Sequence, residues 1–263
     1  NFMQIKEIMT TDIISVSKNE DLQHVMDLMK KHDISKVPVL DGGQLVGIVT
    51  DNVIADKLGS LRSRGVPASH LHASTVMDKN FESIYPQMEV REILATVGRP
   101  GLTMLPVLEN HVLVGVVTKA DLLPFVTVDR PVGDIMTGAV HTVKPEDRVV
   151  HARHLLFTHD IARLPVVEDG RVQGILSDME IAFAFAHIKR SIPLGQQNHR
   201  LRELLVSDVM KKPALVVGRE RTAGEAAAVM LDSNVGCLPV VDGHETLAGI
   251  VTRTDLVRLL NTA

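Results

Sequence analysis

The sequence contains one cysteine, one tyrosine and no tryptophan. A single cysteine excludes an intramolecular disulfide and any metal site built from cysteines alone, as expected for a reducing compartment. With so few large aromatic residues, the chain also lacks the platforms on which single-stranded nucleic acid stacks. These absences exclude disulfide scaffolds, cysteine-only metal proteins and stacking binders of nucleic acid.

Positive charge is not in excess either, because 28 Lys and Arg residues are set against 32 Asp and Glu residues, for a formal net charge of −4. Without a basic field, nucleic acid and anionic membranes are disfavoured as partners. No stretch approaches the roughly 20 apolar residues of a membrane helix. The N-terminus shows no basic segment leading into an apolar one. We therefore expect a soluble, cytoplasmic protein.

The chain does have a repeated pattern, and at 263 residues with 45% hydrophobic content it can bury a substantial core. Four strings resemble one another: ISKVPVL (34–40), LTMLPVL (102–108), IARLPVV (161–167) and VGCLPVV (235–241). A methionine precedes each proline by 29 positions, and a glycine follows it by nine or ten. In chain order these landmarks are Met9, Pro38 and Gly47; Met77, Pro106 and Gly115; Met136, Pro165 and Gly174; Met210, Pro239 and Gly249. Four copies in register indicate an internal repeat.

Each repeat predicts the order β-α-β-β-α. A β-branched run such as 13–16 favours an extended segment. Leu22, Val25, Met26 and Met29 then follow helical spacing, and the proline string, a turn and a second apolar run predict two further strands before a closing helix. The apolar run 181–188 predicts that the last helix of the third repeat is extended. We predict units one to four at 1–58, 70–125, 129–188 and 203–263, in modules 1–125 and 126–263.

The chain resembles four tandem CBS domains arranged as two Bateman modules. The resemblance rests on the Met-Thr starts, the Pro-Val strands and the endings Gly-h-h-[Ser/Thr]-x-x-[Asp/Glu], where h is apolar. It implies an α/β (α+β) fold in which two units pack by their sheets about a pseudo-two-fold axis. The two clefts of such a pair often hold adenosine-containing ligands. The layout is similar to the gamma subunit of AMP-activated protein kinase and to standalone prokaryotic CBS proteins.

The endings are the first candidate site. They pair a hydroxyl with an acid three positions later: Thr118 with Asp121, Ser177 with Glu180, and Thr252 with Asp255. On the residues alone, each pair is a helix capping box. The resemblance implies a second role, with the hydroxyl near the phosphates or ribose and the acid on the ribose hydroxyls. Unit one has Val53 in place of the acid and Asp51 two positions early, so we infer that it lacks the usual ribose site.

Basic residues form the second candidate group. Lys36 and Arg163 stand two positions before their prolines. They could be solvated residues on an edge strand, whereas the resemblance implies contact with ligand phosphates, for which Arg163 is favoured. Arg253 and Lys119 would add positive charge at helix N-termini, which already favour anions.

The segments after each methionine resemble the backbone that contacts adenine edges in the family, and Ala214 and Val216 are the candidates from unit four. Backbone contacts require no particular side chain, so the base itself is not predicted.

Other chemistry is not indicated. His151 and His154 share one face of an expected helix, but without a partnered carboxylate we assign no metal. No phosphate-binding P-loop and no nucleophile elbow occur. We expect a protein that is not an enzyme and requires no cofactor.

The sequence therefore predicts a non-catalytic regulatory sensor that binds AMP, ADP or ATP in clefts between paired units. Two alternatives are S-adenosylmethionine, methylthioadenosine or NAD as the ligand, and a ligand-free scaffold that binds a protein partner. The sequence leaves open whether the chain forms a homodimer and which enzyme or transporter it regulates.

Overall fold

The computed structural model describes residues 3–60, 65–100 and 104–261. Unit one contains η1 (Ile5–Glu7), β1 (Val16–Ser17), α1 (Leu22–His32), β2 (Lys36–Asp41), β3 (Gln44–Thr50) and α2 (Asp51–Gly59). Unit two contains η3 (Ala68–His70), η4 (Ala73–Thr75), α3 (Val90–Val97), β4 (Met104–Glu109), β5 (Val112–Thr118), α4 (Lys119–Leu122) and η5 (Leu123–Phe125).

Unit three contains η6 (Val132–Asp134), α5 (Val149–Thr158), β6 (Arg163–Glu168), β7 (Arg171–Ser177) and α6 (Asp178–Ser191), followed by α7 (Leu194–Glu203). Unit four contains α8 (Val206–Val209), β8 (Val217–Gly218), α9 (Ala223–Asp232), β9 (Cys237–Val241), β10 (Leu247–Thr252), α10 (Arg253–Arg258) and η7 (Leu259–Asn261). The mixed α/β fold built from repeated units is confirmed, and so is the extension of the last helix of unit three.

The first strand of each unit is shorter than its β-branched run. It spans two residues in β1 and β8, and in units two and three it shrinks to single parallel bridges, Ile84 with Val107 and Val143 with Val166. The landmark proline explains why. The carbonyl oxygens of Pro106 and Pro165 accept from this first segment, so the missing amide hydrogen of each proline lies on that side. Pairing cannot continue past a position that has no donor.

Units one and two pack together through their strands, as do units three and four. The segment that opens each unit bridges the second strand of its partner: Thr10 to Val116, Asp78 to Ile48, Thr137 to Ile250 and Lys211 to Ile175. Units one and two also share a five-stranded sheet of order β1-β2-β3-β5-β4. This reciprocal exchange is the paired arrangement that the resemblance implied.

The same exchange explains the landmark glycines and methionines. A Cβ at Gly47 would lie 2.7 Å from the Met77 side chain, and one at Gly115 would lie 2.5 Å from Met9 Sδ. Gly174 meets Met210 and Gly249 meets Met136 in the same way. Each methionine therefore fills a space that the glycine of its partner unit leaves open, and a side chain there would push the paired units apart.

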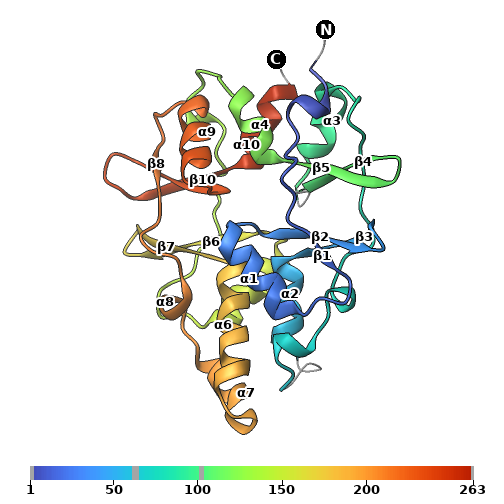
Figure 1. Ribbon diagram of the computed structural model, residues 1–263. Helices are drawn as coiled ribbons and strands as arrows, with labels where there is room; N and C mark the ends of the chain where they lie inside the picture. The colour runs from blue at the N-terminus through green and yellow to red at the C-terminus, as the bar shows by residue number, and fades with distance from the viewer. Residues whose placement is uncertain (1–2, 61–64, 101–103, 262–263) are drawn as a thin grey trace.

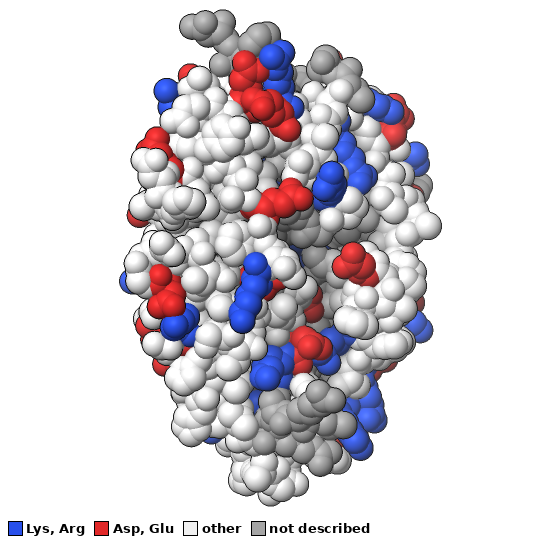
Figure 2. Space-filling model, turned by 90° about the vertical axis from the view of Figure 1, so that its right-hand side faces the viewer, with Lys and Arg blue, Asp and Glu red and all other residues white. Residues whose placement is uncertain are grey.

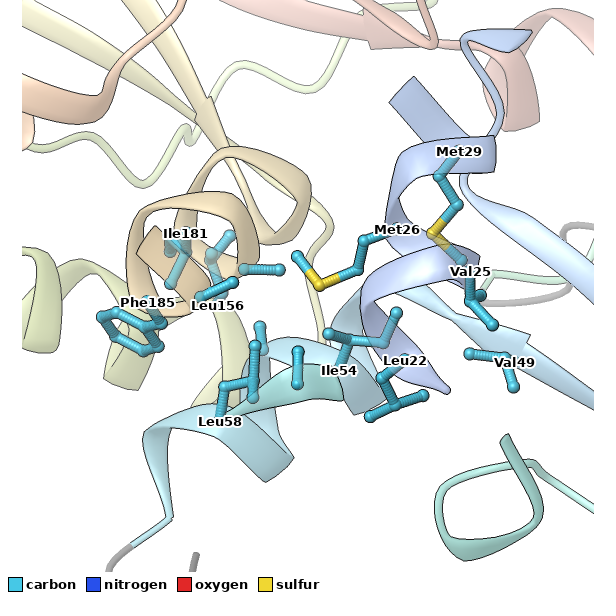
Figure 3. Packing of buried hydrophobic residues seen from close by; sticks show 14 of the residues in the cluster. Leu22, Val25, Met26, Met29, Val49, Ile54, Leu58, Leu156, Ile181 and Phe185 are labelled. Atoms are coloured by element: carbon cyan, nitrogen blue, oxygen red, sulfur yellow. The ribbon is translucent and has the colours of Figure 1, made fainter. Parts of the chain in front are cut away.

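The two modules pack through their helices. One core joins units one and three, and a second joins units two and four. Figure 3 shows Met26 of α1 pointing toward Leu156 and Ile181 of unit three, with Leu58 of α2 below them. Strands lie at mid-height and most helices lie above and below them (Figure 1). Each core is therefore shared between modules.

The α6 and α7 helices extend beyond the other elements at the bottom of Figure 1. The α6 helix has 14 residues, whereas the closing helices α4 and α10 have four and six. Among the described residues, no helix is both long and apolar enough to cross a membrane.

Candidate functional site

The endings of units two, three and four form the capping boxes expected from their residues. The Thr252 amide donates to Asp255 Oδ2 at 2.8 Å, and the Asp255 amide donates back to Thr252 Oγ1 at 3.3 Å. The Thr118 amide donates to Asp121 Oδ2 at 2.7 Å. The Ser177 amide donates to Glu180 Oε2 at 2.8 Å. These acids hold the first turns of α10, α4 and α6, so each has a structural role.

The second oxygen of each acid distinguishes the three endings. Asp121 Oδ1 accepts from the Thr10 hydroxyl at 3.1 Å. Across the described part of the chain, Asp255 Oδ1 and Glu180 Oε1 have no hydrogen-bond partner. Two of the three acids therefore keep an oxygen for a ligand hydroxyl, and Thr10 occupies that oxygen in the third. No local pattern indicates this contact, because Thr10 lies 111 residues from Asp121.

In unit one, the third residue after the capping Thr50 is Val53 and not an acid. The Thr50 hydroxyl contacts the Asn52 side chain instead, and α2 starts at Asp51. The helix thus forms without the ending acid. That unit one lacks a ribose site stays a prediction.

The two basic residues before the prolines are both partly buried. Lys36 is half-buried, and its Nζ donates to Ser35 Oγ at 2.9 Å. Arg163 reaches from unit three to unit four, where a Cβ on Gly236 would lie 2.8 Å from Arg163 Nη2. Gly236 therefore provides the space that the guanidinium occupies.

Lys119 makes a hydrogen bond between modules, whereas the hydrogen bond of Arg253 lies within unit four. Arg253 Nη2 donates to Asn234 Oδ1 at 3.1 Å, while its Nε is buried without a partner among the described residues. Lys119 is 7% exposed, and its Nζ donates to Thr254 Oγ1 at 2.7 Å. Burial lowers the pKa of Lys119 to about 8, and the nearby charge of Lys36 adds to the lowering.

Two aspartates that sequence reasoning did not assign to the site lie with these cations. Asp51 and Asp178 are the first residues of α2 and α6, two helices that pack side by side. Burial raises the pKa of Asp178 to about 7, and Asp51 raises it further, while Arg153, Arg163 and Lys36 oppose the rise. Burial also lowers the pKa of Lys36, against the effect of Asp51.

Six residues from all four units thus form what we call the central charged cluster: Lys36, Asp51, Lys119, Arg163, Asp178 and Arg253. Four of them directly follow the helix-capping residue of their unit, as Asp, Lys, Asp and Arg in chain order. That position is visible in the sequence and could have indicated the cluster. Figure 2 shows acidic and basic side chains around a hollow at mid-height on one face of the molecule.

The candidate adenine segments begin beside the second strand of their partner units. The antiparallel bridge from Lys211 to Ile175 joins the start of the unit-four segment to β7 of unit three. The strand β8, which directly follows Val216, pairs with β9 of unit four. The Val216 side chain is 39% exposed, and Ala214 is half-buried. The segment with Ala214 and Val216 therefore runs between β7 of unit three and β9 of unit four.

In the opposite half of the same module, the antiparallel bridge from Thr137 to Ile250 joins the residues just before segment 139–141 to β10 of unit four. His141 of this segment stacks on His159, with ring centroids 3.7 Å apart. In the described parts of the chain, no group of three His, Cys, Asp or Glu side chains could hold a metal ion.

Comparison with known proteins agrees with this architecture. A family model for the CBS domain matches residues 5–60, 73–127, 132–187 and 206–262. MJ1225 of Methanocaldococcus jannaschii is 22% identical over 94% of both chains. Its crystal structure has a TM-score of 0.85, with 20% identity, 98% coverage of this chain and 100% of that chain, which shows the shared fold.

Shorter relatives match one module. The CBS domain-containing protein YhcV of Bacillus subtilis is 28% identical over 52% of this chain and 95% of its own length. CBSX2 of Arabidopsis thaliana, solved in complex with AMP, is 32% identical over 51% of this chain and 97% of its own, with a TM-score of 0.43. With four matched domains covering most of its length, the chain belongs to the CBS-domain family.

Proposed function

We propose that this protein is a non-catalytic regulatory sensor that binds AMP, ADP or ATP in the clefts between paired units. One observation carries the proposal. The capping acids Asp255 and Glu180 each have a carboxylate oxygen without a hydrogen-bond partner among the described residues, and they follow strands that end at the central charged cluster with its four cations. A carboxylate can accept from two vicinal ribose hydroxyls, and charge-assisted hydrogen bonds to phosphate are among the stronger kinds.

The geometry ranks the clefts. Thr252 and Asp255 come first, because Asp255 keeps an oxygen for ribose and Arg253 follows Thr252 directly in the chain. Ser177 and Glu180 come second, because Glu180 also keeps an oxygen for ribose and Arg163 begins β6 of the same unit. Thr118 and Asp121 come last, because Thr10 competes for the acid.

Regulation would act through the junction between modules. Ligand phosphates in the central charged cluster would contact residues of both modules, so binding would favour one mutual arrangement. Only a difference in affinity between two arrangements can shift their populations. We place this sensor in the cytoplasm, and the enzyme or transporter that reads the arrangement is its proposed partner.

Isothermal titration calorimetry of the nucleotide-stripped protein tests the proposal. AMP, ADP, ATP, S-adenosylmethionine and NAD are titrated separately. Saturable binding of an adenine nucleotide at micromolar Kd, roughly −8 kcal/mol, supports the sensor, and the stoichiometry counts working clefts. Preference for S-adenosylmethionine would replace the nucleotide with the alternative ligand. Absence of heat across the panel would overturn the proposal in favour of a partner-binding scaffold.

The variant Arg163→Ala separates the two ligand classes. A phosphate-bearing ligand should bind about tenfold or more weakly, since a hydrogen bond to a charged group contributes roughly 1.5–3 kcal/mol. An adenosine ligand with a cationic or uncharged tail should bind this variant as it binds the natural protein.

A further inference from the structure

Apolar side chains pack between the paired units of the first module. Six residues from both units form a cluster there: Ile48, Met104 and Val116, which are buried, and Ile13, Phe81 and Leu113, which pack against them. Ile13 and Phe81 each stand four residues after their landmark methionine, so they belong to the candidate adenine segments of units one and two. Side chains from both of these segments therefore occupy space between the units.

The corresponding positions of the second module are more open. Ile175 and Ile250 directly follow their landmark glycines and are half-buried, whereas their two counterparts in the first module are buried. Among the described residues, neither belongs to an apolar core cluster. Val140 and Ala214 stand four residues after their landmark methionines, and they are smaller than the isoleucine and phenylalanine of the first module.

The candidate adenine segment of unit four also exposes large apolar side chains. Leu215 is 41% exposed and Val216 is 39% exposed. Both lie on the segment that runs between β7 of unit three and β9 of unit four. Covering these side chains would remove apolar surface from water, which favours a ligand with an apolar face such as a purine ring.

The hydrogen bonds of the ending acids differ between the modules in the same sense. In the first module, Val53 stands at the acid position of unit one, and Thr10 donates to Asp121 Oδ1 at 3.1 Å. In the second module, both ending acids keep one oxygen without a partner across the described residues. Thr137 stands where Thr10 does, yet no hydrogen bond in the described part of the chain joins its hydroxyl to Asp255. Apolar packing and hydrogen bonding therefore agree.

We propose that only the second module binds nucleotide, because Thr10, Ile13 and Phe81 close the clefts of the first. This inference rests on the proposed function, which it limits to two sites per chain. An adenine ring entering the first module would have to displace an apolar side chain from the cluster and expose it to water. In the second module the same ring would cover Leu215 and Val216, and both ending acids would remain able to accept from ribose.

Calorimetric titration with AMP tests the inference through the number of sites. We expect two AMP molecules per chain. The double variant Glu180→Ala/Asp255→Ala should weaken both sites tenfold or more, because each site loses the hydrogen bonds between a carboxylate and ribose. A site that keeps the natural Kd in this folded variant would lie in the first module and would overturn the inference, while the proposed sensor would stand. If the natural protein binds no adenine nucleotide, the proposed function is wrong and this inference with it.

Closing a cleft of the second module is the converse test. Ala214→Phe gives unit four the side chain that unit two has at Phe81, and it should reduce the count from two AMP molecules to one. Gly243→Phe is the matched control and should keep both sites, because no heavy atom lies within 4 Å of a Cβ at Gly243. If Ala214→Phe also keeps two sites with the natural Kd, a large side chain at this position does not close a cleft and the proposal is wrong.

Opening the first module should have the opposite effect. Thr10→Val/Ile13→Ala frees Asp121 Oδ1 and removes an apolar side chain from the cluster. We therefore expect a third AMP per chain, bound more tightly than in Thr10→Val alone. A count that stays at two in this variant, with a Tm that shows a folded protein, would contradict closure by these two residues.

Discussion

The Asn234 carboxamide donates two hydrogen bonds to Asp33, one to the backbone oxygen at 2.9 Å and one to Oδ2 at 2.8 Å. Asn234 follows α9 of unit four and Asp33 follows α1 of unit one, so the contact joins the modules diagonally. Because Arg253 donates to the same carboxamide, the position of this cation depends on how the modules meet.

Removing this carboxamide should loosen the diagonal contact. Asn234 has a φ of 48°, which favours glycine, so Asn234→Gly deletes the side chain without backbone strain. We expect a loss of about 1–2 kcal/mol in the free energy of unfolding, as for one or two hydrogen bonds, and weaker binding of AMP. Urea unfolding and calorimetry measure these effects. Asp33→Asn should lose less, because the backbone oxygen still accepts.

Gly236 should be essential for the position of Arg163. In Gly236→Ala the new methyl group would meet the guanidinium at 2.8 Å and displace it. We expect AMP to bind about tenfold more weakly with little change in Tm. Gly243→Ala is the control, since no heavy atom lies within 4 Å of a Cβ there. If Gly236→Ala does not weaken AMP binding further in a protein that already carries Arg163→Ala, the displacement is confirmed. If the two losses of affinity add, the displacement is contradicted.

The capping acids should differ in ligand binding. Asp255→Ala should weaken nucleotide binding by about 1.5–3 kcal/mol. It should also lower stability by about 1 kcal/mol through the lost cap. Thr10→Val, which frees Asp121 Oδ1, should instead raise the stoichiometry or affinity at the cleft of unit two. Unchanged affinity in a folded Asp255→Ala protein would refute the ribose assignment.

The sequence predicts each unit well because the landmark spacing reflects contacts within every pair. The contact between Met77 and Gly47, for example, is repeated in equivalent positions by the other three methionines and glycines, and this gives the regular spacing in the sequence. The packing of α2 on α6 has no such periodic signal, since it joins unit one to unit three through ordinary apolar residues such as Leu58 and Phe185. Sequence reasoning therefore predicted the units and the pairs, but not which helices form the cores between modules.

The candidate site shows the same limit. Thr118, Ser177 and Thr252 are recognisable because capping is local, with partners three residues apart. Thr10 on Asp121, and Arg163 over Gly236, depend on chain segments that meet only in the folded protein. The charged residues that directly follow the capping residues can be seen in the sequence. That they meet in the central charged cluster depends on how all four units pack.

Asp178 should make stability depend on pH. Its pKa is raised from 3.8 to about 7, so between these values the folded protein holds a proton that the unfolded chain releases. The folded state then binds more protons, and the free energy of unfolding falls as pH rises from about 4 to about 7. Asp178→Asn should remove this dependence and stabilise the protein above pH 7. Urea unfolding at several pH values tests it, with exposed Asp129→Asn as control.

Lys119 should make binding of phosphate ligands depend on pH in the alkaline range. Its pKa of about 8 means that the ammonium is lost progressively as pH rises through 8. A bound phosphate favours the charged form, so binding takes up protons near this pH and the affinity for ATP falls above it. Calorimetry in buffers of different ionisation enthalpy measures the uptake. In Lys119→Met the affinity for ATP should no longer depend on pH in this range. If this variant takes up the same number of protons on binding, another group is responsible.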